Sequence, residues 1–356
     1  MRLALSLAAR AGARTRPNPM VGAVLVRDGR IVGQGFHRVA GGPHAEVLAL
    51  RRAGARARGA TLYVSLEPCA HTGRTPPCTE AIQAAGVRKV VAAMVDPNPR
   101  NRGRGLRWLK RRGIRTSVGI LEQEARRLNE VFVTWMTAGR PFVTVKVAQS
   151  LDGKIAAHAR TERWISGAAA RRWVHRLRSE MDAILVGIET VLKDDPRLTV
   201  RLGRRPLRPP LKVVLDSRLR TPPSARLFAS GTPVVIATTA TASREREQRL
   251  RRAGADVWRL PSSGGRVDLK SVLKRLAHSE ITHLLVEGGA EVIASAFAAR
   301  IVDRIYCVIA PKIIGGRGAP TSVEGVGAAF LSGVVQLESL TVRCLGSDLL
   351  VTAERA

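Results

Sequence analysis

The sequence contains few cysteines, few aromatic residues and no long apolar run. Four cysteines among 356 residues are too few for a disulfide framework, and they predict a reducing, cytoplasmic location. No apolar run reaches the roughly eighteen residues of a transmembrane helix, so we expect no membrane partner. Arg10 and Arg14 interrupt the apolar start of the chain, which favours an amphipathic helix over a secretory signal. These shortages exclude a secreted disulfide scaffold and a membrane-spanning protein.

Acidic residues are also scarce: 28 Asp and Glu face 59 Lys and Arg, which gives a formal net charge of +31. Such an excess of positive charge raises the question of a nucleic-acid partner. The arginines, however, are spread from Arg2 to Arg355, and aromatic residues make up only 4%, too few to form a stacking platform for single strands. We therefore expect no nucleic-acid partner, because a basic surface also suits a phosphorylated small substrate.

Alternating helix and strand patterns predict two α/β domains, residues 1–139 and 140–356, with a break at Gly139-Arg140-Pro141. In the first domain, Asp28-Gly29 between two β-branched runs predicts a hairpin. The helices expected there cover residues 2–13, 44–56, 76–86, 103–112 and 121–137. In the second domain, five or six apolar strands alternate with helical stretches. This pattern indicates a mainly parallel sheet that ends in an antiparallel pair around Gly346-Ser347.

One short stretch combines the groups that a catalytic zinc ion needs. Such an ion takes three protein ligands and leaves its fourth position to water. His44, Cys69 and Cys78 supply an imidazole and two thiolates, and each comes where a helix can begin. Glu46 lies two residues beyond His44, where its carboxylate can carry a proton between zinc-bound water and a leaving amine without binding the metal. The pattern therefore predicts a hydrolytic zinc site.

Each of these residues alone has a simpler interpretation. Cys69 and Cys78 could be small buried apolar residues, and His44 could be a helix cap. Their combination, with "HAE" before them and "EPC" at the end of a strand, favours the metal site. Cys307 and Cys344 lie in apolar strands, where we expect no metal-binding role.

These motifs resemble a known enzyme family. "HAE…EPC" is similar to the signature of zinc deaminases that act on cytidine-type rings, but that signature closes with C-x-x-C, and here eight residues separate Cys69 from Cys78. "EPCxHxGxTPPC", with "PNPMVGAV" upstream and "DPNP" downstream, resembles the RibD family of bifunctional riboflavin-biosynthesis pyrimidine deaminase/reductases. The resemblance covers essentially the whole chain. It implies an N-terminal cytidine-deaminase-like α/β/α domain and a C-terminal dihydrofolate-reductase-like α/β domain.

The resemblance assigns residues of the first domain. It places the zinc ligands on His44, Cys69 and Cys78 and the proton shuttle on Glu46. The substrate contacts that it implies in this domain are Asn18, His37, His71, Arg74, Asp96 and Asn98.

Some of these assignments have alternatives. Arg74 stands where other members have lysine, and either side chain can meet a phosphate. Ala70 stands where serine is common, which leaves the metal ligands intact. A surface-loop histidine is the alternative for His37 and His71, and a turn residue is the alternative for Asn18.

The second domain lacks the dinucleotide-binding fingerprint G-x-G-x-x-G after its first strand, so a Rossmann site is not supported. "VEGGAEVIASAFAA" reads as a strand, two glycines and a helix, where a phosphate can approach the helix N-terminus. A plain strand–turn–helix would look the same. "KVAQSLDGKIA" and "GIETVLKDDPRLTVR" add polar clusters at the ends of apolar strands, where α/β sites lie.

These segments resemble the reductase half of the same family, which uses NADPH. The implied NADPH contacts are Ala148, Trp164, Thr190, Asp194, Ser217, Gly289, Ala290, Glu291, Val292, Ile293, Ala294 and Ser295. The implied substrate contacts are Lys146, Glu162, Arg178, Leu198, Arg201 and Glu287.

The physical roles of these groups differ. Arg178 and Arg201 can hold a sugar phosphate, and Lys146, Asp194 and Glu287 can bind ribose hydroxyls or polarise the carbon that receives hydride. Serine is also found at position 162 in the family, and Trp164 has the alternative role of a core aromatic. The general acid of the reduction cannot be singled out from the sequence.

The leading hypothesis is a bifunctional riboflavin-biosynthesis enzyme that uses Zn2+ and NADPH. Zinc-dependent hydrolysis would deaminate 2,5-diamino-6-(5-phosphoribosylamino)pyrimidin-4(3H)-one, and NADPH would then reduce the ribosyl group to ribityl. The resemblance also implies a homo-oligomer through the second domain. Two rivals are a deaminase that edits a flipped nucleic-acid base, and a structural zinc domain fused to an inactive α/β module.

Overall fold

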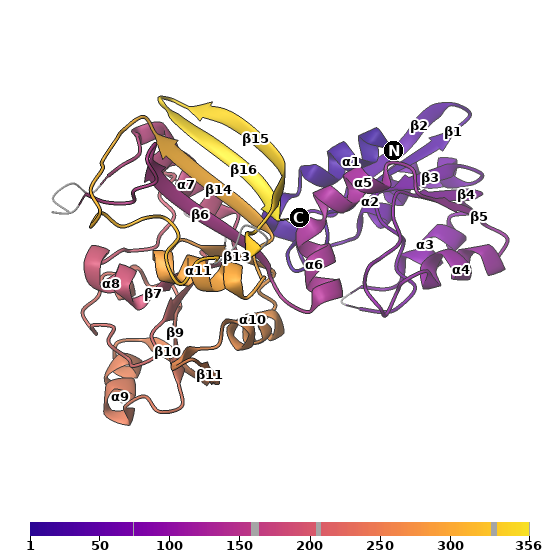
Figure 1. Cartoon of the computed structure of the whole chain (residues 1–356). Helices are drawn as coiled ribbons and strands as arrows, with labels where there is room; N and C mark the ends of the chain where they lie inside the picture. Colours follow the sequence, from indigo (N-terminus) through magenta and orange to yellow (C-terminus); the bar gives the residue numbers. More distant parts are fainter. Residues whose placement is uncertain (74, 158–163, 204–207, 329–332, 356) are drawn as a thin grey trace. The chain divides into compact units, whose positions relative to one another are not determined.

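The computed structural model of the chain describes residues 1–73, 75–157, 164–203, 208–328 and 333–355. The chain forms two compact units, Met1–Arg140 and Pro141–Ala356, each with its own sheet and core (Figure 1). Among the described residues, no helix is long and apolar enough to cross a membrane.

The first unit is built on a five-stranded sheet with the order β2-β1-β3-β4-β5. Its strands are β1 (Gly22–Arg27), β2 (Arg30–Phe36), β3 (Thr61–Val64), β4 (Lys89–Ala92) and β5 (Arg115–Val118). β1 is antiparallel to β2 and β3, whereas β3, β4 and β5 run parallel. The predicted hairpin is confirmed: Asp28 and Gly29, with φ angles of 48° and 73°, form the turn between β1 and β2.

Six α-helices pack around this sheet (Figure 1). They are α1 (Arg2–Ala9), α2 (Ala45–Ala53), α3 (Cys78–Ala84), α4 (Arg104–Arg111), α5 (Glu122–Leu128) and α6 (Glu130–Ala138). The single helix predicted over 121–137 is wrong, because the chain breaks at Asn129. The Asn129 side chain is engaged by the backbone of Met20: its Oδ1 accepts from the Met20 N–H at 2.8 Å, and its Nδ2 donates to the Met20 carbonyl at 3.0 Å.

Two glycines of β2 allow α2 to lie close against the sheet. A Cβ on Gly33 would come within 2.3 Å of the Ala49 carbonyl, and a Cβ on Gly35 within 2.7 Å of the Leu48 Cβ. The absence of side chains at these two positions therefore sets how closely α2 approaches the sheet. This matters for function because the N-terminus of α2 carries the "HAE" motif.

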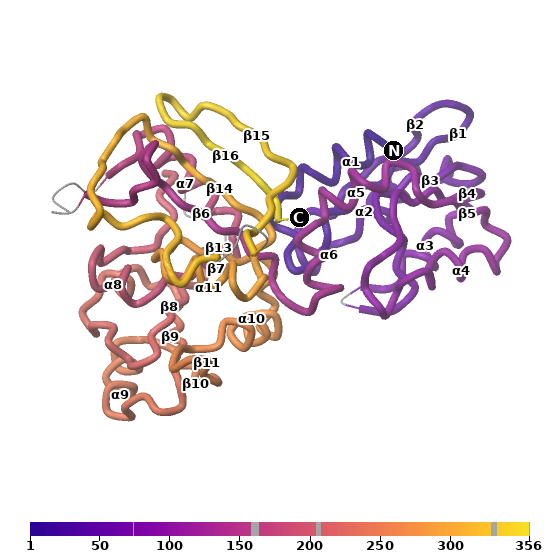
Figure 2. Tube along the Cα trace, in the orientation of Figure 1, coloured from indigo at the N-terminus to yellow at the C-terminus, as the bar shows by residue number. Residues whose placement is uncertain are grey.

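The second unit contains a nine-stranded sheet with the order β10-β9-β8-β7-β13-β6-β14-β16-β15. Its strands are β6 (Phe142–Ser150), β7 (Ala183–Gly187), β8 (Leu211–Leu215), β9 (Val234–Thr239), β10 (Ala255–Leu260), β13 (His283–Val286), β14 (Arg304–Ala310), β15 (Leu337–Leu345) and β16 (Asp348–Arg355). The seven strands from β10 to β14 in this order are parallel, and β16 is antiparallel to both of its neighbours, β14 and β15. The predicted parallel sheet and terminal pair are both confirmed, and Figure 2 shows this pair in yellow.

The remaining described elements of this unit are α7 (Ala168–Ser179), α8 (Ile188–Asp194), a short 3-10 helix (Phe228–Ser230), α9 (Arg244–Arg252), α10 (Leu269–His278), α11 (Ala290–Ala298) and the hairpin of β11 (Ser262–Ser263) and β12 (Arg266–Val267). Strands β7 and β13 are buried along their whole length, as expected for parallel strands covered on both faces. The predicted strand, glycine pair and helix is also confirmed: β13 is followed by Glu287, Gly288, Gly289 and α11.

Candidate active sites

Three side chains converge in the first unit, two from the N-termini of helices and one from the loop after a strand. His44 is the residue before α2, Cys69 follows β3, and Cys78 is the first residue of α3. The His44 Nδ1 atom lies 3.1 Å from the Cys78 Sγ and 3.6 Å from the Cys69 Sγ. All three donor atoms lie within 4.8 Å of one another. Among the described residues, this is the group of His, Cys and carboxylate donors that can hold a metal ion.

The donor set fits zinc. Around a tetrahedral zinc ion with bonds of about 2.0–2.3 Å, two donor atoms lie roughly 3.5 Å apart, close to the separations seen here. The His44 Nε2 lies 3.3 Å from the Thr75 hydroxyl, so a proton on Nε2 leaves Nδ1 free to bind metal. Two sulfurs, one imidazole nitrogen and one open position are the ligands of a catalytic rather than a closed structural zinc site.

A hydrogen bond couples the two thiols, so that their pKa values shift in opposite directions. The hydrogen bond from Cys78 lowers the pKa of Cys69 to about 4, and the same contact raises the pKa of Cys78. The Cys78 N–H also donates to the Cys69 Sγ at 3.3 Å, so the start of α3 favours a thiolate there. A divalent cation would release the remaining proton and bind both thiolates.

Glu46 lies in the first turn of α2 and is 3% exposed. Burial raises the pKa of Glu46 to about 7, against the opposing effect of His44. A carboxyl group with this pKa can both accept and donate a proton near neutral pH.

Asn18 and His37 lie beside the metal ligands. The His37 Nδ1 lies 3.1 Å from the Pro43 carbonyl, and its Nε2 lies 3.1 Å from the Asn18 Nδ2. Because the carbonyl requires a donor at Nδ1, Nε2 accepts from Asn18 and the ring is neutral. Burial lowers the pKa of His37, which agrees with the neutral form. The His37 and His44 rings meet edge to face at 5.4 Å, so the structure brings His37 to the metal cluster.

Glu67 and Asn101, two residues that the sequence interpretation missed, organise the loops around the cluster. The Glu67 carboxylate accepts from the N–H groups of Asp96, Gly103 and Leu106 at 2.8–3.1 Å. The buried Asn101 accepts from the Ala70 N–H at 3.0 Å, next to Cys69. Glu67 is the glutamate of the "EPC" motif, so the sequence did mark its position. Its hydrogen-bond partners are distant in the sequence, and the motif alone does not reveal them.

Asp96 also belongs to this network. Its carboxylate accepts from the Asn98 N–H at 2.9 Å and from the Asn101 amide at 3.0 Å. Burial raises the pKa of Asp96 to about 6, despite these hydrogen bonds. Asp96 and Asn98 therefore lie on one short loop that Asn101 ties to the Cys69 segment. Arg74 lies outside the described residues.

In the second unit, three of the predicted substrate residues form one partly buried charge cluster. Arg178 of α7 binds Glu287 at two points, at 2.6 and 2.5 Å. Burial lowers the pKa of Lys146, although the nearby Glu287 opposes the shift. Burial alone would raise the pKa of Glu287, but Arg178 and Lys146 outweigh it and lower that pKa. The Arg178 guanidinium and the Lys146 amine therefore both act on the same carboxylate, that of Glu287.

His175, which the sequence interpretation missed, extends this cluster. It lies one helical turn before Arg178 on α7, and its Nδ1 accepts from the Arg201 N–H at 3.3 Å. Burial, with the charges of Arg178 and Arg201, lowers the pKa of His175. Leu198, which precedes Arg201 in the sequence, is buried in the apolar core. The sequence shows that His175 and Arg178 are spaced to lie on one face of a helix. It does not show that His175 contacts Arg201.

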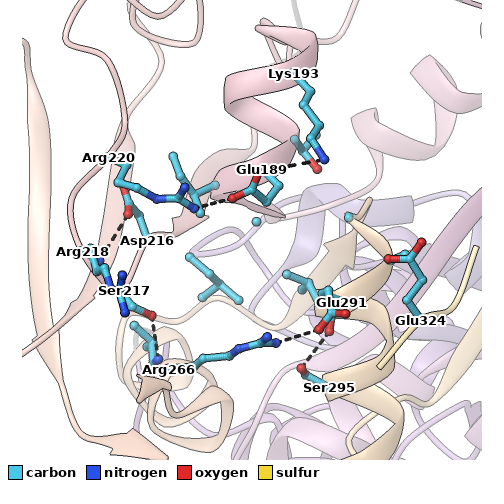
Figure 3. Close-up of a pocket in the computed structure, with 18 of the residues that line it drawn as sticks. Glu189, Lys193, Asp216, Ser217, Arg218, Arg220, Arg266, Glu291, Ser295 and Glu324 are labelled. Atoms are coloured by element: carbon cyan, nitrogen blue, oxygen red, sulfur yellow. Dashed lines mark hydrogen bonds and ion pairs between the residues drawn. The ribbon is translucent and has the colours of Figure 1, made fainter. Parts of the chain in front are cut away.

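A cavity of about 510 Å³ opens at the carboxyl ends of β7, β8 and β13 (Figure 3). The predicted NADPH contacts that line it are Thr190, Asp194, Ser217, Gly289, Ala290, Glu291, Val292 and Ser295. Gly288 has a φ of +120°, which favours glycine, and a Cβ on Gly289 would meet the Thr190 hydroxyl at 3.4 Å. Missed residues that also line it are Glu189, Lys193, Arg218, Arg220 and Arg266.

Other predicted contacts lie outside the lining of this cavity. Ala148 is in β6 and packs against an apolar cluster, and the exposed Trp164 carries the Arg171 guanidinium 5.3 Å above its ring. Ile293 and Ala294 lie on α11 between the lining residues Val292 and Ser295 but do not line the cavity themselves. Glu162 lies outside the described residues.

Comparison with known proteins agrees with this geometry. Residues 1–94 match the family described as "Cytidine and deoxycytidylate deaminase zinc-binding region", and residues 141–351 match "RibD C-terminal domain". "Riboflavin biosynthesis protein RibD" of Aquifex aeolicus is 44% identical over 100% of this chain and 97% of its own length. The Escherichia coli protein of the same name is 41% identical over 98% of this chain and 96% of its own.

Solved structures show the same two-unit architecture. Acinetobacter baumannii RibD superposes with a TM-score of 0.89 and 37% identity, covering 100% of this chain and 97% of the other. A Thermotoga maritima diaminohydroxyphosphoribosylaminopyrimidine deaminase/5-amino-6-(5-phosphoribosylamino)uracil reductase does so with a TM-score of 0.86, 36% identity and the same coverage.

Fold, donor cluster and matches together define a two-domain enzyme, a zinc-dependent deaminase followed by an NADPH-dependent reductase. The resemblance seen in the sequence extends over both domains at high identity. The chain belongs to the RibD family of bifunctional deaminase/reductases of riboflavin biosynthesis.

Proposed function

We propose that the first domain hydrolytically deaminates 2,5-diamino-6-(5-phosphoribosylamino)pyrimidin-4(3H)-one at a site formed by His44, Cys69, Cys78 and Glu46. The observation that carries this proposal is the convergence of the three donor atoms within 4.8 Å, with the buried Glu46 two residues from His44. Zinc held by these residues would supply a nucleophile at neutral pH, because such an ion lowers the pKa of water to about 7.

The protein's own groups move the protons and hold the ring. Glu46 accepts a proton as the nucleophile forms and returns it to the departing amine, for which its pKa of about 7 is suited. Asn18 and Asp96 present an amide and a carboxylate to the polar edge of the pyrimidine. His37 holds the Asn18 amide in place through the 3.1 Å contact at Nε2.

For the second domain we propose that the 510 Å³ cavity would hold NADPH, which would supply the hydride for reduction at C1 of the opened ribose. Lys146 and Glu287 lie at the reacting end, and Arg178 and Arg201 bind the substrate phosphate. The support is the partly buried cluster of Arg178, Glu287 and Lys146 next to Gly288 and the start of α11. Electrostatic attraction by two cations suits a phosphomonoester.

We also propose a homo-oligomer formed through the second domain. β15 is an edge strand of the nine-stranded sheet, and its residues from Leu337 to Cys344 are exposed. Leu340 and Val342 are 61% and 55% exposed, unusual for apolar residues on an edge strand. Light scattering should show that Leu340→Lys lowers the molar mass in solution. Val118→Lys, on the edge strand of the first unit, should leave the mass unchanged.

The working compartment that we propose is the cytoplasm, and we propose no nucleic-acid partner. The four cysteines include none in a disulfide within the described residues, and Cys69 and Cys78 must stay reduced to bind metal. The basic surface then serves phosphorylated small molecules rather than a polynucleotide.

Product analysis by mass tests both activities together. With the phosphoribosylaminopyrimidine alone, we expect the mass change of replacing an amino group by oxygen, together with ammonia release. Addition of NADPH should then add two hydrogens. Ammonia release from single-stranded DNA or tRNA, with none from the small molecule, would favour the base-editing rival and overturn the proposal.

A further inference from the structure

The acidic and basic side chains that line the cofactor cavity are largely paired with one another. Arg220 forms an ion pair with Glu189, which also lies 4.0 Å from Lys193. Arg266, on β12, forms an ion pair of 2.8 Å with Glu291 in the first turn of α11. Three of the four cations in the lining therefore already contact carboxylates.

Arg218 is different. It lines the same cavity, but its guanidinium makes no ion pair or hydrogen bond to any residue that the structure describes (Figure 3). It follows Ser217, whose hydroxyl accepts from the Val267 N–H at 3.1 Å. An uncommitted guanidinium beside a hydroxyl, in a cavity open to ligand, is suited to bind a phosphate.

The backbone around Arg218 is fixed. The buried Asp216 carboxylate accepts from the Thr221 N–H at 2.7 Å and the Thr221 hydroxyl at 2.8 Å, which closes the loop after β8. Leu219 is 3% exposed and anchors the middle of this loop in the core. Arg218 and Arg220, on either side of Leu219, therefore both face outward.

The position of Arg218 in the sheet indicates which end of the cofactor it meets. Glu287, at the reacting end, follows β13, and β8 lies two strands away in the order β8-β7-β13. Two strand spacings amount to roughly 10 Å. A dinucleotide with its nicotinamide beside Glu287 and its pyrophosphate beside Gly289 would thus place its adenosine half at the end of β8.

We propose that Arg218 binds the 2′-phosphate of NADPH and is the residue that selects NADPH over NADH. This inference rests on the proposed assignment of the cavity to the cofactor. NADH presents a hydroxyl at the same place and gains no charge-assisted contact there. A guanidinium–phosphate contact accounts for a preference of roughly ten- to a hundredfold.

Binding of 2′,5′-ADP and 5′-ADP to the purified full chain, measured by calorimetry, tests this without the reaction. The two ligands differ in the 2′-phosphate. We expect Arg218→Gln to weaken 2′,5′-ADP roughly ten- to a hundredfold and to change 5′-ADP by less than about twofold. The KM for NADPH should rise in parallel while that for NADH stays constant. Arg244→Gln, an exposed residue of α9 that removes the same charge outside the cavity, should leave both affinities unchanged.

Two results would overturn the inference. One is an Arg218→Gln chain that keeps its preference for 2′,5′-ADP, and the other is one that loses affinity for both nucleotides equally. Failure of the proposed function itself looks different, because the unmodified chain would then bind neither NADPH nor 2′,5′-ADP. A melting temperature equal to that of the parent chain verifies that the variant is folded.

Discussion

Arg178 and Glu287, which are 109 residues apart in the sequence, form a two-point ion pair in the second domain: Nε contacts Oε1 at 2.6 Å and Nη2 contacts Oε2 at 2.5 Å. The two side chains are 14% and 7% exposed. Their charges, with that of Lys146, are held out of water by the fold, so each depends on the others. This relationship makes the reductase site sensitive to the loss of a single charge.

We therefore expect Glu287→Gln to inactivate the reductase and leave deamination intact. The substitution leaves Arg178 and Lys146 buried without an anion, which costs about 3–5 kcal/mol in the free energy of unfolding of this domain. NADPH oxidation and ammonia release, measured on the same preparation, separate the two activities. Glu247→Gln breaks the comparable pair with Arg259 outside the cavity and serves as the control. Unchanged NADPH oxidation in Glu287→Gln would remove this residue from the site.

Glu46→Gln should abolish deamination and retain zinc. Glutamine keeps the shape of the side chain but cannot accept or return a proton, so we expect kcat to fall roughly 10²–10⁴-fold. Zinc content should equal that of the parent chain, and so should NADPH oxidation when the reductase is supplied with the already deaminated substrate. A fully active Glu46→Gln chain would support the rival in which the metal has a structural role.

Asp96 should make the stability of the first domain depend on pH. Its folded-state pKa of about 6 lies above the ordinary 3.8, so the folded chain binds the proton more tightly. Asp96 therefore lowers the free energy of unfolding as the pH rises from about 4 to about 6, by up to about 3 kcal/mol. The Asp96→Asn variant has no carboxyl group at this position, so its free energy of unfolding does not show this decrease.

Hydrogen exchange of the β3 and β4 amides, compared between Asp96→Asn and the parent chain at each pH, measures this effect. The variant should gain protection relative to the parent between pH 4 and pH 7. If the difference in amide protection between the variant and the parent stays constant over that pH range, burial does not raise the pKa of Asp96.

Glu67→Gln should weaken deamination through the loop that carries Cys69. The carboxylate accepts from three backbone N–H groups, and an amide would bring its NH₂ against at least one of those donors. We expect a loss of about 1–3 kcal/mol in the free energy of unfolding and a lower kcat in the first domain. Since Glu67 positions other groups, zinc affinity should fall as well. If a Glu67→Gln chain loses deamination while its zinc affinity and its free energy of unfolding stay unchanged, that result would contradict a positioning role for Glu67.

The sequence predicted those parts of the protein that depend on local patterns. Asp28-Gly29 marked a hairpin because both positions require positive φ, and the alternation of apolar strands with helices indicated the parallel sheet. The helix predicted over 121–137 failed because Asn129 is engaged by Met20, more than a hundred residues away. Apolar periodicity carries no information about such a contact.

The same limit applies to the sites. His44, Cys69 and Cys78 were recognisable because their residue types and order match one chemistry, and the structure brings them together. Glu67, Asn101 and His175 were missed because their roles come from partners that are distant in the sequence. Trp164 could be placed only by the fold, which leaves it exposed with Arg171 over its ring.

The central claim is that one imidazole and two thiolates hold a zinc ion in the first domain. Metal analysis of the purified chain, with Cys69→Ser and Cys78→Ser beside the control variants Cys307→Ser and Cys344→Ser, tests it most directly. We expect one zinc per chain in the parent and in both controls, and none in Cys69→Ser or Cys78→Ser. Stoichiometric zinc that persists in Cys69→Ser and Cys78→Ser, or a parent chain without zinc, would contradict it.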